Sequence, residues 1–307
     1  MEQEQWCIRV NRQCAEEKRQ ELNRSGLLDR ALKPRAEGDA ILFPVTEYLE
    51  GATRCQFFAH PAEEELPRHE LIGGIAVMQE RNIPGAEKLL ASRPSLHTIL
   101  FPESQVEGDF RTRRFEVLAG VPTTKTSYME YGLSFAIDLE AAYFSARLAS
   151  ERRRILARMS AGERVLDMFA GVGPFALALA GSASLVVASD INPAAILLMA
   201  ENIRLNRAGR VLPVLSDADR LPGFLPRTFD RVIMNFPLYA YRFLPSALRL
   251  CRPGGTIHCY ALVSREGELL PVIDRIPIEA VEERYVRSYS PGKWHAVYDI
   301  ILEKKTA

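Results

Sequence analysis

After residue 140, short apolar runs alternate with longer stretches of helical spacing. The five apolar runs have the length of buried strands and lie at 164–169, 184–191, 210–217, 230–236 and 254–262. The helical windows between them lie at 176–180, 194–206 and 243–250. A strict alternation of strand and helix predicts an α/β domain with a parallel, doubly wound sheet, which binds ligands at the carboxyl ends of its strands.

The chain before residue 140 has a different pattern. Residues 1–48 predict a small domain with a strand around 6–10, a helix over 15–28 and a strand over 40–45. Residues 49–70 carry Gly51, Pro61, Pro67 and three consecutive glutamates, a composition typical of a linker. The mixed pattern over 70–140 predicts an α+β middle domain, so the doubly wound domain occupies 141–307.

Composition excludes several classes of protein. No apolar run reaches the roughly 20 residues of a membrane-spanning helix, and the first residues are polar and charged, so we expect a soluble cytoplasmic protein. Thirty-nine basic residues balance thirty-nine acidic ones, which excludes nucleic-acid binding through net charge alone. The five cysteines form no C-x-x-C pair, so we expect reduced thiols and no metal site.

The first strand of the last domain runs into a glycine-rich turn. Gly171 and Gly173 lack the Cβ atoms that would keep a ligand away, and Asp167 can accept hydrogen bonds from it. Glycine turns between strand and helix also serve packing alone. The turn lacks the third glycine of G-x-G-x-x-G, because position 176 is alanine, so it favours adenosine without a pyrophosphate.

The next two strands also end in carboxylates. Asp190, followed by Ile191 and Asn192, is placed to bind the ribose hydroxyls, and Asp217 could meet the amino group of an adenine. The alternative for these side chains is helix capping, since Asn192-Pro193 also opens a helix. An adenosine pocket without a pyrophosphate cradle favours S-adenosylmethionine over NAD.

The segment D-x-F-A-G-x-G-P-F, with the Asp190 strand and Asn235-Phe236-Pro237, resembles class I methyltransferases, which have a Rossmann-like fold. The resemblance implies that S-adenosylmethionine is the cofactor. It places the cofactor against Asp167, Phe169, Gly171, Gly173, Pro174, Asp190, Ile191, Asn192, Asp217, Asn235 and Pro237. Amine methyltransferases of this class usually carry a second proline where this chain has Leu238.

Residues 141–155 carry an apolar stripe beside a charged face, if the segment is helical. Phe144, Leu148 and Ile155 fall on the stripe, while Tyr143, Arg147, Glu151 and Arg154 fall on the neighbouring face. From Arg147 to Arg158 five arginines stand against one glutamate. Such a cluster suits phosphate contacts, although a solvated helix face has the same pattern.

Nearly the whole chain resembles the archaeal and eukaryotic tRNA (guanine-N1)-methyltransferases that act at position 37. The resemblance rests on the segments 107–113, 143–152, 167–175, 231–237 and 288–291, and on the small amino-terminal unit. It implies that Glu151 is the general base, Arg111 contacts the guanine O6 and Tyr143 packs on the base. It further implies that Arg147, Arg152, Arg113 and Asn235 help to hold the nucleotide. This chain has Ser145-Ala146 where the family usually has Asn-Pro.

These residue types suit the chemistry. Guanine N1 carries a proton, so a base must remove it while a cation stabilises charge on O6. The expected partner is tRNA, through its anticodon region and folded body, with no membrane and no obligate protein partner. One alternative is aminocarboxypropyl transfer to a wyosine-type base, or methylation of the wyosine precursor. Two others are a nicotinamide-dependent oxidoreductase and a non-catalytic RNA-binding module.

Overall fold

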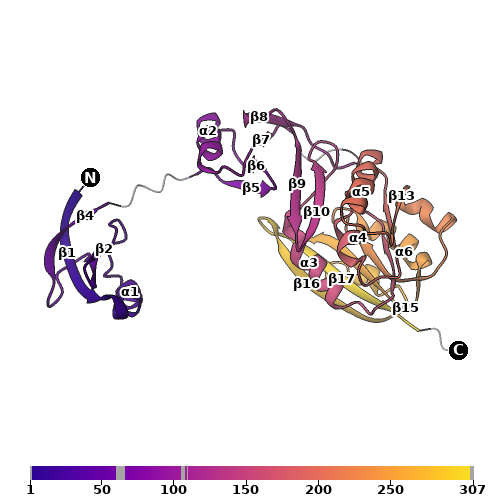
Figure 1. Ribbon diagram of the computed structural model, residues 1–307. Coiled ribbons are helices and arrows are strands. Elements are labelled where there is room, and N and C mark those ends of the chain that lie inside the picture. The colour runs from indigo at the N-terminus through magenta and orange to yellow at the C-terminus, as the bar shows by residue number, and fades with distance from the viewer. Residues whose placement is uncertain (1, 60–65, 105–107, 109, 305–307) are drawn as a thin grey trace. The chain divides into compact units, whose positions relative to one another are not determined.

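A computed structural model describes residues 2–59, 66–104, 108 and 110–304 of the chain (Figure 1). The chain forms two compact units, residues 1–66 and residues 67–307. The first unit is therefore longer than the 48 residues that the sequence predicts. The predicted boundary between 70–140 and 141–307 falls inside the second unit and stays a prediction.

The first unit is a four-stranded antiparallel sheet with one helix. Its strands are β1 (Glu2–Asn11), β2 (Arg35–Glu37), β3 (Ala40–Val45) and β4 (Thr53–Phe58), in the order β2-β3-β1-β4. A 3-10 turn η1 (Arg12–Cys14) leads into helix α1 (Ala15–Arg24), whose Leu22 packs on Phe43 and Val45 of β3. The helix ends four residues earlier than predicted, because Gly26 has a positive φ of 73°.

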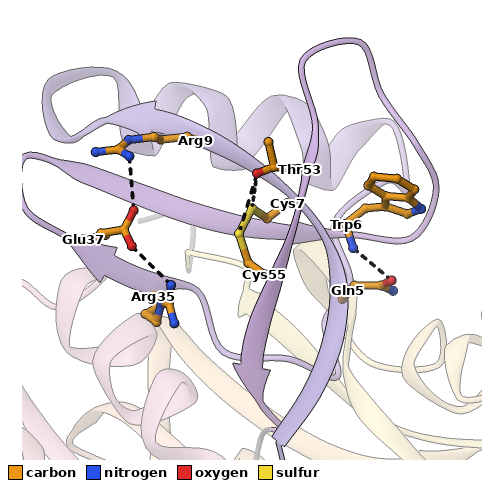
Figure 2. The surroundings of a disulfide bond; sticks show 8 residues. All are labelled: Gln5, Trp6, Cys7, Arg9, Arg35, Glu37, Thr53 and Cys55. Carbon is orange, nitrogen blue, oxygen red and sulfur yellow. Dashed lines mark hydrogen bonds and ion pairs between the residues drawn. A yellow bond between two sulfur atoms is a disulfide. The ribbon is translucent and has the colours of Figure 1, made fainter.

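Two expectations for this unit are wrong. Residues 53–58 lie in the predicted linker but form β4, which pairs with β1 along its whole length. Cys7 of β1 and Cys55 of β4 are joined in a disulfide, with Thr53 beside Cys7, although the sequence predicts reduced thiols (Figure 2). The two cysteines are 48 residues apart in the sequence. They meet because β1 and β4 are neighbours in the sheet, which no local pattern reveals.

The second unit begins with a four-stranded sheet, a helix and a hairpin. The sheet has the order β5-β6-β7-β8 and consists of β5 (His69–Ile72), β6 (Ile75–Met78), β7 (Thr98–Pro102) and β8 (Phe115–Gly120). Helix α2 (Ile83–Ser92) connects the parallel pair β6 and β7, and Asn82 caps it by accepting a hydrogen bond from Gly85 N. The hairpin consists of β9 (Lys125–Glu130) and β10 (Leu133–Asp138).

A seven-stranded sheet forms the body of this unit, in the order β13-β12-β11-β14-β15-β17-β16. The five predicted strands are confirmed as β11 (Arg164–Asp167), β12 (Leu185–Asp190), β13 (Val211–Leu215), β14 (Phe229–Met234) and β15 (Cys251–Val263). They run parallel to one another. The sequence does not predict β16 (Ile278–Ser290) and β17 (Lys293–Leu302), an antiparallel pair that closes one edge.

The strands are continuously apolar because helices cover both faces of the sheet. Val165 belongs to one core cluster, with α3 (Ala149–Ala157), α4 (Pro174–Leu179) and α5 (Pro193–Leu205). Leu166 belongs to the other, with η3 (Ala218–Gly223) and α6 (Leu244–Leu250). Two shorter elements are η4 (Ala240–Phe243) and α7 (Leu270–Ile273). Successive strand residues thus enter opposite cores, as the pleat requires.

Asn202 of α5 and Asn206, which follows the last residue of this helix, hold the hairpin. Asn202 is fully buried, accepts a hydrogen bond from Ala136 N at 2.6 Å and donates to Ala136 O and Val172 O at 3.2 and 3.0 Å. Asn206 exchanges bonds of 2.8 and 2.7 Å with the backbone of Ser134. These side chains make the hydrogen bonds to the backbone of β10 that a second neighbouring strand would otherwise make, so they fix the hairpin against the helix.

The predicted helix over 141–155 begins later than expected. Ser145 is extended, a 3-10 turn η2 (Ala146–Leu148) follows it, and α3 starts at Ala149. The apolar stripe is nevertheless buried, because Phe144, Leu148 and Ile155 all enter one core cluster. Since residues 141–145 are not helical, Tyr143 does not share a helical face with Glu151.

Candidate active site

A cavity of about 420 Å³ lies at the carboxyl ends of β11, β12 and β14. Its lining includes most of the residues that the sequence assigns to the cofactor. These are Phe169, Gly171, Pro174, Asp190, Ile191, Asn192, Asp217 and Asn235. Asp167 and Gly173 are not in the lining, although both lie in the same turn.

The glycine-rich turn after β11 borders the cavity. Gly171 and Gly173 have φ values of 55° and 89°, a region that favours glycine, and Gly173 precedes the first turn of α4. A Cβ on Gly173 would lie 2.8 Å from Met199 Cγ of α5, so this glycine serves close packing between helices. Gly171 borders the cavity, where the absence of a side chain leaves room.

Asp190 holds the turn and the following helix together. Its carboxylate accepts hydrogen bonds from Gly171 N at 2.7 Å and from Asn192 N at 2.9 Å. Burial raises its pKa, opposed by these backbone bonds. Each carboxylate oxygen keeps a second lone pair, so Asp190 can still accept from a bound hydroxyl.

Asp167 is 1% exposed, and its Oδ2 has no hydrogen-bond partner among the described residues. Burial raises the pKa of Asp167 to about 7, with a smaller contribution from Asp190. A buried carboxyl oxygen without a partner costs free energy unless a ligand or water satisfies it.

Two other polar side chains cap helices, which is the alternative role that the sequence allows for them. Asn192 accepts from Ala194 N at 2.9 Å as the N-cap of α5, and it donates to Ala141 O at 2.7 Å. Asp217 accepts from Asp219 N at 3.0 Å as the N-cap of η3. Both also line the cavity, so capping and ligand binding are compatible here.

Aromatic side chains form one wall of the cavity. Phe169 stacks on Phe236 with ring centroids 5.0 Å apart, and Phe243 meets Phe169 edge-on at 5.1 Å. Tyr239 and Arg242 extend this wall. Tyr239, Arg242 and Phe243 are not among the residues that the sequence assigns to the site, although a cluster of aromatic residues directly after the fourth strand is a signal for them.

A smaller second cavity adjoins the first and shares Arg111, Tyr143, Leu148 and Asn235 with it. Its lining also includes Pro237, Arg287, Tyr289 and His295. The Arg111 guanidinium lies 4.8 Å from the centre of the Tyr143 ring and 5.5 Å from that of Phe236. The segment 107–113 is only partly visible, because Glu107 and Asp109 lie outside the described residues. Pro237, which the sequence assigns to the cofactor, lines this smaller cavity, and its carbonyl accepts a hydrogen bond from Leu262 N at 2.9 Å.

A third cavity, of about 350 Å³, is lined by the arginines at 111, 113, 147 and 287. Arg147 forms an ion pair with Glu70 of β5 at 2.5 Å, and the Arg113 guanidinium lies 5.9 Å from the Phe115 ring centre. Four guanidinium groups around one hollow make a site suited to an anion. Of the five arginines between 147 and 158 that the sequence singles out, Arg147 lines this cavity, whereas Arg152, Arg154 and Arg158 form ion pairs elsewhere.

Glu151 does not line any of these three cavities. Its carboxylate is 1% exposed and accepts hydrogen bonds from Arg154 Nε at 2.8 Å and Tyr260 Oη at 3.2 Å. Arg284 is a more distant ion-pair partner, at 3.8 Å. Arg154 is itself fixed by Asp299 of β17, so the carboxylate belongs to a buried charge network.

Arg152 lines the large cavity but is paired elsewhere. Its guanidinium binds both carboxylate oxygens of Glu130, at 2.6 and 2.5 Å, with side-chain exposures of 1% and 4%. The structure therefore brings Arg111, Tyr143 and Asn235 together beside the cofactor residues. Glu151 lies outside all three cavities, and Arg147 and Arg113 line the third.

Among the described residues, no three metal-ligating side chains lie close enough together to hold an ion. No helix in the described part of the chain is long and apolar enough to cross a membrane.

Comparison with known proteins identifies the family. The model of the TRM5/TYW2 methyltransferase domain matches residues 126–285, more than half of the chain, and the model of the tRNA methyltransferase 5 N-terminal domain matches residues 7–53. A tRNA (guanine(37)-N(1))-methyltransferase, Trm5b, from Pyrococcus abyssi is 33% identical, and the alignment covers 92% of this chain and 94% of the relative.

The chain belongs to the TRM5/TYW2 methyltransferase family. A solved complex of aTrm5 with tRNALeu has a TM-score of 0.72 and 28% identity, and the match covers 97% of this chain and 100% of the other. A Methanocaldococcus jannaschii tRNA(Phe) (4-demethylwyosine(37)-C(7)) aminocarboxypropyltransferase is 30% identical over 77% of this chain and 98% of its own length.

Family membership confirms the predicted class I, S-adenosylmethionine-dependent methyltransferase domain and the small amino-terminal domain. It removes the oxidoreductase and the non-catalytic RNA-binding module as alternatives. The roles assigned to individual site residues remain predictions.

Proposed function

We propose that this enzyme transfers a methyl group from S-adenosylmethionine to N1 of guanosine 37 of tRNA. The observation that carries the proposal is the pair of adjoining cavities, with Arg111, Tyr143 and Asn235 at their junction. The larger cavity has the size and the polar groups for an adenosine. The smaller, of about 20 Å³, has unpaired polar atoms for the edge of a base and must widen to admit one. At this junction the methyl group would pass from the cofactor to the base.

Residues of the larger cavity fit the cofactor. The Asp190 carboxylate would accept the ribose hydroxyls, and the wall formed by Phe169 and Phe236 would pack against the apolar faces of the molecule. When bound, S-adenosylmethionine supplies an electrophilic methyl group. The chain's own residues must then orient the target base and remove its N1 proton.

Arg111 is the residue we assign to the guanine O6. Its Nε is buried without a hydrogen-bond partner in the described structure, and its guanidinium lies over the Tyr143 ring. A positive charge beside O6 stabilises the anion that forms when N1 is deprotonated. Asn235 Oδ1, also without a partner, can accept a hydrogen bond from a base N–H group.

Glu151 is the residue we assign as general base. The role requires its carboxylate to exchange a present partner, Arg154 or Tyr260, for the N1 proton of the base. Arg147, Arg113 and Arg152 are proposed to help hold the nucleotide. Of these, Arg147 and Arg113 line the third cavity, which suits a flanking phosphate.

The amino-terminal unit is proposed to bind the folded body of the tRNA. Its family model and the relative solved in complex with tRNALeu support this assignment. The aminocarboxypropyltransferase relative leaves about a quarter of this chain unmatched, whereas the Trm5b relative leaves 8% unmatched. Methyl transfer is therefore favoured over aminocarboxypropyl transfer. Action in the cytoplasm, where tRNA is modified, is part of the same proposal.

The deciding experiment uses unmodified tRNA with guanosine at position 37 and labelled S-adenosylmethionine, followed by nucleoside analysis. We expect 1-methylguanosine at position 37. Aminocarboxypropylguanosine or no product would contradict the proposal. A second substrate that carries the wyosine precursor tests that additional activity.

The general base is tested by Glu151→Gln in single-turnover assays. Loss of a general base slows transfer by about 10²–10⁴-fold. We expect binding of tRNA and cofactor to stay close to wild type. Glu201→Gln, an exposed position on α5, is the matched control and should leave the rate unchanged. An unchanged rate in Glu151→Gln would remove Glu151 from the mechanism.

A further inference from the structure

The smaller cavity contains a histidine to which the proposed mechanism gives no role. His295 lies on β17, opposite Leu262 of β15 and Arg287 of β16, so strands on both sides fix its backbone. Its side chain is 2% exposed and lines the cavity beside Arg111, Tyr143 and Asn235.

His295 Nε2 has no hydrogen-bond partner among the described residues. Three other buried atoms without such partners belong to residues of the same cavity: Arg111 Nε, Asn235 Oδ1 and Arg287 Nε. A buried polar group without a partner costs about 1–3 kcal/mol, so such groups are rare in folded proteins. Their concentration around one cavity indicates a ligand with several hydrogen-bonding atoms on its edge.

The second buried histidine of the sheet shows the contrast. His258 of β15 is 1% exposed, and both of its ring nitrogens have partners. Nδ1 lies 2.6 Å from Asp299 Oδ1, and Nε2 lies 2.6 Å from Arg231 Nη1. His258 therefore serves the charge network, whereas His295 keeps one nitrogen available within the cavity.

The surroundings of His295 keep the imidazole neutral. Burial lowers its pKa to about 4, and the positive charges of Arg287 and Arg111 act in the same direction. The other titratable groups that face it are the tyrosines at 143, 260 and 289, and the Tyr260 ring centre lies 5.5 Å away. A neutral ring carries one N–H donor and one acceptor, so it can pair with a heterocycle without adding charge.

We propose that His295 binds the target base directly, through a hydrogen bond from its neutral imidazole Nε2 position to the edge of the purine. This inference rests on the proposed function, because it takes the smaller cavity as the site of guanine 37. His295 would then share the base with Arg111 and Asn235, and it would orient N1 for transfer.

The test compares His295→Phe and His295→Gln in single-turnover methylation of tRNA with guanosine 37. Phenylalanine keeps the ring volume and removes the polar atoms, whereas glutamine returns a polar group near the position of Nε2. Loss of one hydrogen bond corresponds to a fall in kcat/KM of roughly threefold to tenfold for His295→Phe. We expect His295→Gln to recover most of this loss, and cofactor affinity to stay unchanged in both variants.

Trp294→Phe is the matched control, because this neighbour on β17 packs against Tyr285 and lines none of the three cavities. If His295→Phe does not fold, His295→Gln is compared with His295→Asn, whose shorter amide reaches only the Nδ1 position. A higher rate for glutamine than for asparagine supports the contact, and equal rates contradict it.

A pH profile separates a neutral partner from a titrating base. Since the imidazole stays neutral above about pH 4, the acid limb of the rate profile should be the same in wild type and His295→Phe. An acid limb that shifts or disappears would overturn the proposal, as would wild-type kcat/KM in His295→Phe. The proposed function fails separately, if wild-type enzyme forms no 1-methylguanosine.

Discussion

Replacement of Arg152 by methionine tests whether this guanidinium serves the fold or the substrate. Arg152 on α3 binds Glu130 at the end of β9 through two hydrogen bonds, and both side chains are nearly inaccessible. Methionine retains most of the side-chain volume, so the principal change is the loss of the charge that compensates the Glu130 carboxylate.

The expected cost is large because the remaining carboxylate stays buried. Removal of one partner of a buried ion pair destabilises a protein by about 3–5 kcal/mol. For a unit of this size each kcal/mol lowers Tm by about 2–4 °C, so Arg152→Met should lower it by roughly 6–20 °C. The double variant Arg152→Met/Glu130→Leu removes both charges and should recover most of this loss.

Urea and thermal unfolding can be followed in the second unit alone. The chain has two tryptophans, Trp6 in the first unit and Trp294 in the second, so a Trp6→Phe background makes the fluorescence specific for residues 67–307. Arg153→Met is the control, because this neighbour is exposed and its guanidinium lies 4.7 Å from the Tyr131 ring centre. It should cost less than about 1 kcal/mol.

A small effect on stability would contradict a structural role for the Arg152–Glu130 ion pair. If Arg152→Met stays within about 1 kcal/mol of wild type while the affinity for tRNA falls, the guanidinium serves the substrate. The pairing with Glu130 would then be exchanged for a phosphate or base when tRNA binds.

Two further predictions concern stability. Asn202→Ala removes three hydrogen bonds between α5 and its neighbours and leaves the half-buried backbone groups of Ala136 and the buried carbonyl of Val172 without these partners, so urea denaturation should show a loss of about 3 kcal/mol, against under about 0.5 kcal/mol for the exposed control Glu201→Ala. Burial raises the pKa of Asp167 to about 7 in the ligand-free protein. The folded state therefore binds a proton more tightly than the unfolded state does, and wild type loses stability as pH rises from about 4 to 7. Asp167→Asn lacks this loss, so its stability relative to wild type should increase over that interval and level off above it; a relative decrease would contradict the pKa shift.

The five parallel strands of the large sheet, and the gathering of polar residues at their carboxyl ends, could be predicted from the sequence. Strands β11 to β15 are visible as apolar runs because both of their faces are buried. Since the carboxyl ends of parallel strands meet at one edge, the carboxylates of Asp190 and Asp217 and the glycine turn could be placed at one site before the structure was known.

The tertiary structure alone decided which charged residues meet. Arg152 pairs with Glu130 across 22 residues, and Arg154 pairs with Asp299 across 145. Local spacing places Arg154 on a charged helix face and counts Arg152 in the same basic cluster, but their partners depend on how β9 and β17 pack against α3. Glu151 shows both cases: helical spacing places its partner Arg154 on the same face, whereas its partner Tyr260 lies 109 residues away and is not revealed by the sequence.

His295 and the Cys7–Cys55 disulfide show the physical reason most clearly. Each depends on strand order and register: β17 lies between β15 and β16, and β4 lies beside β1. Periodicity along the chain specifies which face of a strand is buried, but not which strand becomes its neighbour. Neighbours are selected by the packing of the whole sheet, so residues far apart in sequence come together only in the folded molecule.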